Sequence, residues 1–113
     1  MIKKELVTEL TESEFLRVID DRKVPLVIVD FFAEWCMPCM MMSPILESIA
    51  EKNPKIKFVR INVDDAQELA NKYEVSSIPC IIFFKEGKEV DRVTGLVPED
   101  VLREKVEDYL RLE

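Results

Sequence analysis

The chain has 113 residues, of which 48% are hydrophobic and 35% are charged, a length and composition that favour one globular domain spanning residues 1–113. Its 23 acidic and 16 basic residues give a net charge of -7. This balance argues against nucleic acid or an anionic membrane as the main partner, because binding either one requires Lys and Arg to neutralise phosphates.

The residues that are absent also narrow the chemistry. The chain has no His, which excludes Cys–His and Ser–His nucleophile systems and histidine metal sites. Its two glycines are too few for a glycine-rich phosphate loop. The start of the chain, MIKKELVTEL, holds no apolar stretch long enough for a signal peptide, and the longest aliphatic run, Leu26 to Val29, is too short to cross a bilayer. We therefore expect a soluble, cytoplasmic protein.

The first half of the chain predicts two strands, each followed by a helix. A short strand is expected at about residues 5–10, and the capping-box pattern T-E-S-E from Thr11 opens a helix to about residue 21. The run VPLVIVDFF, residues 24–32, is nearly continuously apolar and rich in β-branched residues, as in a strand buried on both faces. A helical period then covers residues 36–52, with an expected kink at Pro44.

The second half predicts a third strand at residues 56–63, a short helix at 66–73 and a fourth strand at 80–84. The sequence K-E-G-K at 85–88 is typical of a hairpin turn that leads to a fifth strand at 89–93. Pro98 and the acids after it suit the first turn of a last helix. The early β-α-β units predict parallel strands and the late hairpin adds an antiparallel edge, which gives an α/β fold with a mixed sheet.

Two of the three cysteines form a C-x-x-C motif where the buried strand passes into a helix. At a helix N-terminus, unpaired backbone N–H groups and the macrodipole stabilise the thiolate of Cys36 by about 0.3–2 kcal/mol, enough to bring a thiol pKa of about 8.5 near neutrality. Cys39 is one turn further on, close enough to close a short disulfide ring, and Pro38 stiffens the loop. The alternative is half of a zinc or iron–sulfur site. Because the chain has one further Cys and no His, that site would have to be shared between subunits.

Several segments together resemble the thioredoxin family over nearly the whole chain. They are VDFFAEWCMPC at 29–39, a helix containing Pro44, RINVD at 60–64 and SIPCIIFFKEGKEV at 77–90. The resemblance implies the thioredoxin fold, a central mixed sheet of about five strands flanked by about four helices, with the dithiol on the surface at one end. It also implies a thiol–disulfide oxidoreductase that reduces protein disulfides, with Cys36 as nucleophile and Cys39 as resolving cysteine.

The same resemblance implies that the reversible Cys36–Cys39 disulfide is the only redox group, with no bound cofactor and no metal. The partners would be disulfide-containing protein substrates and a thioredoxin-reductase-like electron donor, and we expect a monomer. Three alternatives stay open. The protein could be an oxidant or isomerase, a glutaredoxin-like oxidoreductase, or a non-catalytic binding module that uses the apolar surface around Trp35.

Two further residues would act at the dithiol. Asp30 interrupts an apolar strand, where desolvation raises the pKa of a carboxyl, and the family resemblance makes it the proton acceptor and donor for Cys39. The alternative is a carboxyl that only meets a local hydrogen-bond partner. In the thioredoxin pattern the peptide bond between Ile78 and Pro79 is cis, which would bring the Ile78 backbone beside the dithiol to pair with substrate.

The remaining binding residues follow from the resemblance too. The predicted substrate-binding surface consists of Trp35, Met37, Pro38, Ile78, Thr94 and Gly95, extended by Leu96. Trp35 has an alternative interpretation as a core aromatic residue. Arg60 stands where thioredoxins often carry a Lys near the buried Asp, but it is equally a solvated charge at a strand end and stays outside the predicted catalytic set.

The chain also departs from the family pattern. Met37 replaces the usual Gly between the cysteines, so the reduction potential does not carry over. Met40 replaces a common Lys, which removes a cation near the thiolate, and residues 40–42 are interpreted as helix packing and an apolar rim rather than a soft-metal site. Phe32 stands where a second Trp is usual. Cys80 is interpreted as a small buried hydrophobe, with an auxiliary thiol as the alternative.

Overall fold

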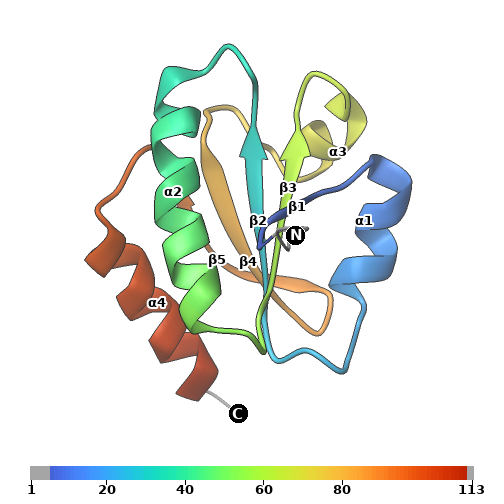
Figure 1. Cartoon of the computed structure of the whole chain (residues 1–113). Coiled ribbons are helices and arrows are strands. Elements are labelled where there is room, and N and C mark those ends of the chain that lie inside the picture. The colour runs from blue at the N-terminus through green and yellow to red at the C-terminus, as the bar shows by residue number, and fades with distance from the viewer. Residues whose placement is uncertain (1–5, 112–113) are drawn as a thin grey trace, which may run out of the picture.

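The computed structural model describes residues 6–111, which form a five-stranded sheet covered by four helices (Figure 1). The strands are β1 (Thr8–Glu9), β2 (Val27–Phe32), β3 (Lys57–Asn62), β4 (Cys80–Lys85) and β5 (Lys88–Thr94). The helices are α1 (Glu12–Ile19), α2 (Met37–Lys52), α3 (Gln67–Lys72) and α4 (Glu99–Arg111). None of these helices is both long and apolar enough to cross a membrane.

The sheet is mixed, with the strand order β1-β3-β2-β4-β5. Strands β1, β3 and β2 run parallel, whereas β4 is antiparallel to both β2 and β5. The predicted combination of parallel strands and a late antiparallel hairpin is therefore confirmed. Strand β2 lies in the middle, and the C-terminal ends of β2 and β3 meet at one end of the sheet, beside the start of α2 (Figure 1).

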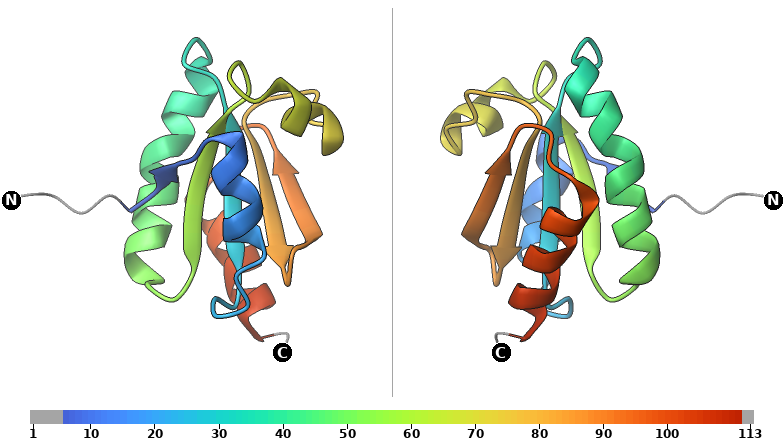
Figure 2. Two further views of the ribbon diagram at one scale, coloured as in Figure 1. Left: turned by 90° about the vertical axis from the view of Figure 1, so that its right-hand side faces the viewer. Right: turned by 90° about the vertical axis from the view of Figure 1, so that its left-hand side faces the viewer.

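Helices cover both faces of the sheet, α2 and α4 on one side and α1 and α3 on the other (Figure 2). Side chains alternate along β2, so Val27, Val29 and Phe31 pack in the core under α1 and α3, while Ile28 packs under α2 and α4. All six residues of β2 are buried, as the continuous apolar run predicted. By the same alternation Asp30 follows Ile28 on the α2 side.

The predicted boundaries of two elements differ from the observed ones, because backbone hydrogen bonding sets where each element begins or ends. Strand β2 begins three residues later than expected, after Pro25, which has no N–H to donate to a neighbouring strand. The hairpin turn is shorter than K-E-G-K, since Lys85 and Lys88 pair across it and only Glu86 and Gly87 form the turn, with φ of 52° and 79°. Positive φ at both central residues matches the twist of the flanking strands.

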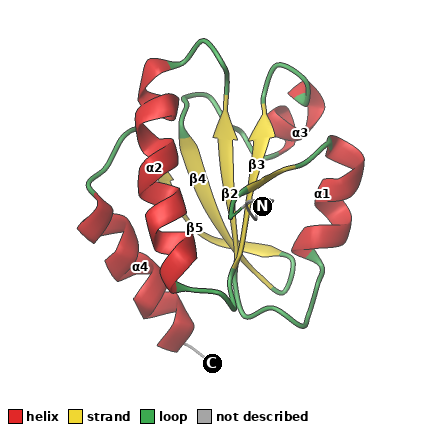
Figure 3. Cartoon of the chain, viewed as in Figure 1, coloured by secondary structure: helices red, strands yellow, loops and turns green. Residues whose placement is uncertain are grey.

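Two further expectations concern helix starts and the first strand. The capping box at Thr11 is confirmed: its Oγ1 accepts from the Glu14 N–H, and its own N–H donates to Glu14 Oε1 at 2.9 Å. Helix α2 runs as one element from Met37 to Lys52 with Pro44 inside it (Figure 3). The first strand is present at Thr8–Glu9, and residue 5 of the predicted range lies outside the described residues.

Candidate active site

The dithiol lies where β2 has ended and α2 begins. Cys36 is the N-cap residue of α2 and is joined to Cys39 by a disulfide, with the two Cα atoms 5.3 Å apart. The N–H of Cys39 donates to Cys36 Sγ at 3.2 Å, which satisfies one of the free N–H groups of the first helical turn. Cys36 keeps 4% of its surface exposed and Cys39 keeps 1%, so substrate has better access to Cys36. The sequence predicted this position for the pair.

A buried carboxyl belongs to the same end of the sheet. Asp30 is 1% exposed, and neither of its carboxylate oxygens has a hydrogen-bond partner among residues 6–111. Loss of water around the carboxyl raises its pKa from 3.8 to about 7, although the positive charge of Arg60 acts in the opposite direction. The alternative of a carboxyl satisfied by a local partner is wrong. Asp30 is therefore able to bind or release a proton near neutral pH.

Arg60 lies beside Asp30 because the two residues are register partners on the parallel strands β3 and β2. Its guanidinium carbon lies 3.8 Å from the centre of the Phe32 ring, a cation–π contact, and its Nε is buried without a hydrogen-bond partner in the described part of the chain. Arg60 is therefore half-buried, with its guanidinium against Phe32 and the residue lining an open pocket, and it stays outside the predicted catalytic set. The signal that pointed to it was the Lys that thioredoxins often carry at this place.

A pocket of about 290 Å³ opens next to Cys39 and the guanidinium of Arg60. The residues that line it are Glu9, Phe32, Ala33, Glu34, Cys39, Met40, Ser43 and Arg60. It brings solvent near the less exposed cysteine, on the side of β3. Sequence reasoning did not predict this opening, because it depends on how β1, β3 and the first turns of α2 fit together.

The segment before β4 lies against the disulfide. The Ile78–Pro79 peptide bond is cis, the isomer that the resemblance implies, and Ile78 packs against the small cluster that contains both active-site cysteines. The N–H of Gly95 donates to the carbonyl oxygen of Pro79 at 2.8 Å, and Thr94 pairs with Cys80 across β4 and β5. The structure thus brings the Ile78–Pro79 and Thr94–Gly95 segments together beside the dithiol.

Exposed apolar side chains surround Cys36. Trp35 is 72% exposed, so the core alternative is wrong, and its indole N–H donates to Asp64 Oδ2 at 3.0 Å. Met37 and Pro38 are exposed in the first turn of α2. In the methionine run, Met42 packs in the core, whereas the other two are exposed, as a helix-packing and rim interpretation predicts.

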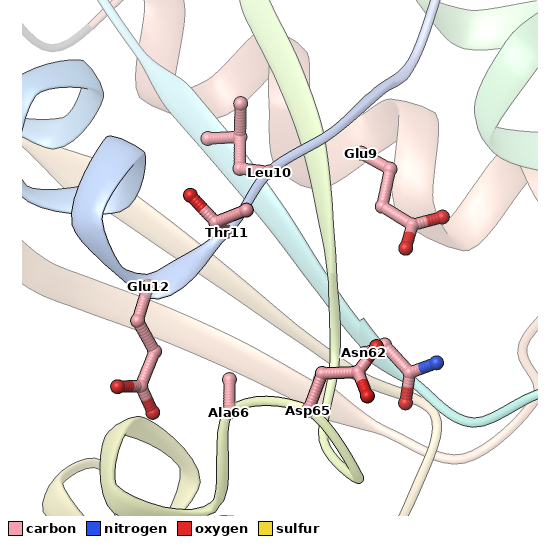
Figure 4. A pocket seen from close by; sticks show the side chains of 7 residues that line it. All are labelled: Glu9, Leu10, Thr11, Glu12, Asn62, Asp65 and Ala66. Atoms are coloured by element: carbon pink, nitrogen blue, oxygen red, sulfur yellow. The ribbon is translucent and has the colours of Figure 1, made fainter.

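A second pocket of about 290 Å³ lies between β1, α1 and the loop after β3 (Figure 4). Its carboxylates, from Glu9, Glu12 and Asp65, stand apart in Figure 4 instead of converging. Glu12 already accepts a hydrogen bond from the N–H of Leu69 at 3.2 Å. Over residues 6–111 no group of three or more His, Cys, Asp or Glu side chains is arranged to hold a metal ion.

The third cysteine is separate from the dithiol. Cys80 is 1% exposed, is not in a disulfide, and packs in the core under α1 and α3. Burial raises the pKa of its thiol, although the Arg92 guanidinium, 4.0 Å from the sulfur, acts in the opposite direction. Cys80 therefore fits the interpretation of a small buried hydrophobe.

Comparison with known proteins decides the family, because the thioredoxin family model matches residues 6–108. The chain belongs to the thioredoxin family. Thioredoxin from Chlamydia pneumoniae is 53% identical over 77 residues, which cover 68% of this chain and 76% of the relative. Thioredoxin 1 from Nostoc sp. is 41% identical over 103 residues, covering 90% and 95%. The crystal structure of a thioredoxin from Nicotiana alata superimposes with a TM-score of 0.86 at 30% identity, covering 96% of each chain.

Family membership and the site agree on the reaction class. This thioredoxin-family chain is a thiol–disulfide oxidoreductase with protein-disulfide reductase activity, and its redox-active group is the Cys36–Cys39 disulfide. The predicted thioredoxin fold is confirmed as well, with a mixed five-stranded sheet and four helices over the described residues. A non-catalytic binding module does not account for a closed disulfide at this helix N-terminus.

Proposed function

We propose that Cys36 attacks the substrate disulfide and that Cys39 completes the reduction. The Cys36 thiolate bonds to one substrate sulfur and releases the other as a thiolate. Cys39, after losing its proton, attacks Cys36 Sγ and expels the second substrate sulfur. Two electrons pass from the dithiol to the substrate, and the Cys36–Cys39 disulfide remains. The observation that carries this proposal is the disulfide at the N-terminus of α2, with the Cys39 N–H directed at Cys36 Sγ.

Asp30 is the proton acceptor for Cys39 in this proposal. A buried carboxyl whose pKa is about 7 is ionised in a useful fraction of molecules at neutral pH and is basic enough to take a proton from a thiol. Because no described residue donates a hydrogen bond to the Asp30 carboxyl, both of its oxygens are available. The adjacent Arg60 limits how far the pKa of Asp30 rises, and so keeps the base partly ionised.

Substrate would bind across the segments that meet beside the disulfide. The backbone of Ile78, before cis-Pro79, is proposed to pair with an extended substrate segment. The residues proposed to contact that segment are Trp35, Met37, Pro38, Ile78, Thr94, Gly95 and Leu96. The exposure of Trp35, Met37 and Leu96, the packing of Ile78 against the dithiol cluster and the hydrogen bond from Gly95 to Pro79 support this assignment.

The proposal also covers partners and setting. Because the disulfide itself carries the electrons, no bound cofactor is required, and a thioredoxin-reductase-like donor would regenerate the dithiol. We propose that residues 1–113 act as one domain and as a monomer in the cytoplasm. The family match over residues 6–108 supports the single domain.

Trapping the intermediate tests the assignment of the two cysteines. A Cys39→Ser variant should accumulate a mixed disulfide between Cys36 and a model protein disulfide, seen as a stable adduct by non-reducing gel and mass spectrometry. A Cys36→Ser variant should accumulate none, and both variants should be made in a Cys80→Ala background so that Cys80 cannot contribute. An adduct through Cys39 in the Cys36→Ser variant would reverse the proposed order.

The reduction potential separates a reductase from an oxidant or isomerase. A value near the roughly −270 mV known for thioredoxin supports a general reductase and makes Met37 a tolerated variation. A value above about −200 mV would instead indicate an oxidant or isomerase. The potential follows from equilibration in thiol buffers, with the free thiols counted by mass spectrometry.

A further inference from the structure

Basic residues are distributed unevenly along this chain. The sequence has no Lys or Arg in residues 24–51, 61–71, 73–84 or 93–102. These stretches supply the dithiol loop, the first three turns of α2, the loop after β3, the cis-proline segment and the loop after β5. Among the described residues, cations gather instead at the opposite end of the sheet, where Lys57 pairs with Val27 and Lys85 pairs with Lys88.

The surface around the dithiol is therefore apolar and acidic. We call it the dithiol face and define it by the exposed apolar residues Trp35, Met37, Met40, Met41 and Leu96 and the exposed acids Glu34, Asp64 and Asp65. Among the described residues, the cation that borders this face is Arg60, which lines the same pocket as Glu34 and Met40. Its guanidinium stacks on the Phe32 ring and its Nε is buried, so it adds little positive charge to the outer surface.

Trp35 and Asp64 form a unit suited to a cation. The indole N–H of Trp35 donates a hydrogen bond to Asp64 Oδ2, with 3.0 Å between the nitrogen and the oxygen, and this bond holds the ring in place. Even so, Trp35 is 72% exposed. A Lys or Arg side chain over an exposed indole face gains about 0.5–1 kcal/mol, and a carboxylate at the ring edge adds to that attraction. Glu34, the residue before Trp35, is also exposed and adds a second negative charge to the same loop.

We propose that the dithiol face selects protein disulfides whose cysteine is flanked by apolar and cationic side chains, and disfavours those flanked by acids. The inference rests on the proposed reductase function. Charge complementarity of this kind acts mainly on the association rate, because like charges repel before contact and opposite charges steer the encounter. Salt weakens it, since exposed charges are screened over about 10 Å at 0.1 M ionic strength.

The test uses three synthetic disulfide peptides that differ only in the residues flanking an apolar–Cys core: Lys, Ser or Glu. At low ionic strength we expect kcat/KM for the Lys peptide to exceed that for the Glu peptide by about tenfold or more, with the Ser peptide between them. In about 1 M salt the ratio should fall toward one. Equal rates for the three peptides at low salt would overturn the inference.

Two charge variants test whether the dithiol face causes the preference for the Lys peptide. A Glu34→Gln/Asp65→Asn variant should lose most of the discrimination between the Lys and Glu peptides. The matched control Glu51→Gln/Glu104→Gln removes the same number of negative charges from exposed sites at the end of α2 and on α4. This control should keep the discrimination between the two peptides. If the control loses as much discrimination as the first variant, net charge and not this face is responsible, and the inference fails.

The Ser peptide keeps the two proposals distinguishable. If the wild-type protein does not reduce the Ser peptide while a chemical dithiol does, the proposed reductase function fails. If the Ser peptide is reduced and the charged peptides follow it at the same rate, only the charge preference fails.

Discussion

Replacing Asp30 with Asn should stabilise the oxidised protein at neutral and alkaline pH. The pKa of Asp30 is raised from 3.8 to about 7 by burial, a difference of about 3 pK units, or about 4 kcal/mol at 1.36 kcal/mol per unit. This energy is what the folded protein loses when the buried carboxyl ionises. Asn has the same shape and no charge, so the variant avoids that loss.

The sign follows from proton binding. Between about pH 4 and pH 7 the folded state holds a proton on Asp30 that the unfolded state has released, so wild-type stability falls as pH rises through this window. Below about pH 4 both states are protonated and the variant should resemble the wild type. Above about pH 7 both states are ionised, and the variant should be more stable by up to about 4 kcal/mol.

Urea unfolding followed by circular dichroism, at intervals from pH 4 to pH 8, measures this difference. A Glu104→Gln variant, which removes an exposed acid on α4, serves as the control and should follow the wild-type pH dependence. The reasoning is refuted if the Asp30→Asn and wild-type curves stay parallel across the range, or if the variant is the less stable protein at pH 8.

The other predictions concern the neighbours of Asp30 and two glycines. Replacing Arg60 with Met should raise the pKa of Asp30 above its value of about 7, because the guanidinium charge acts to lower it; carboxyl NMR titration measures this, and an unchanged pKa would contradict the assigned cause. Gly87→Ala should cost more stability than Gly95→Ala in urea unfolding. Both glycines have positive φ, worth about 1 kcal/mol of strain for Ala, but only at Gly87 would a Cβ come within 2.7 Å of Asp20 Oδ1. Equal losses would mean that Asp20 moves aside freely.

The sequence predicted the parts of the site that depend on local order. A buried strand followed by C-x-x-C and a helical period places Cys36 at a helix start, because the N-cap follows from the pattern alone. It also identified Asp30 as a desolvated carboxyl, since a charged residue within VIVDFF has little access to water. The reaction class then followed from the resemblance of several separated segments.

Sequence could not predict what depends on strand register and on side-chain packing between elements. The pairing of Asp30 with Arg60 requires the register of β2 against β3, and the stacking of Arg60 on Phe32 requires that both side chains meet at the strand ends. The spacing of residues along the chain indicates neither the register of the two strands nor the contact between the two side chains. The hairpin turn was predicted too long for a related reason: Lys85 pairs with Lys88 only because Glu86 accepts a positive φ, which its residue type does not suggest.

The acidic dithiol face has a consequence for the attacking thiol. Carboxylates near Cys36, such as Glu34, oppose the thiolate that the N-terminus of α2 stabilises, and the Lys common at position 40 in the family is a Met in this chain. A cationic side chain that docks on Trp35 would bring a positive charge to the same place and stabilise the Cys36 thiolate there. Attack by Cys36 should then be fastest in the complex with a cationic substrate. Binding of a cationic substrate to this face would thus increase both the rate of association and the rate of attack by Cys36. The two effects are separable, because only the effect on the rate of attack persists once substrate is saturating.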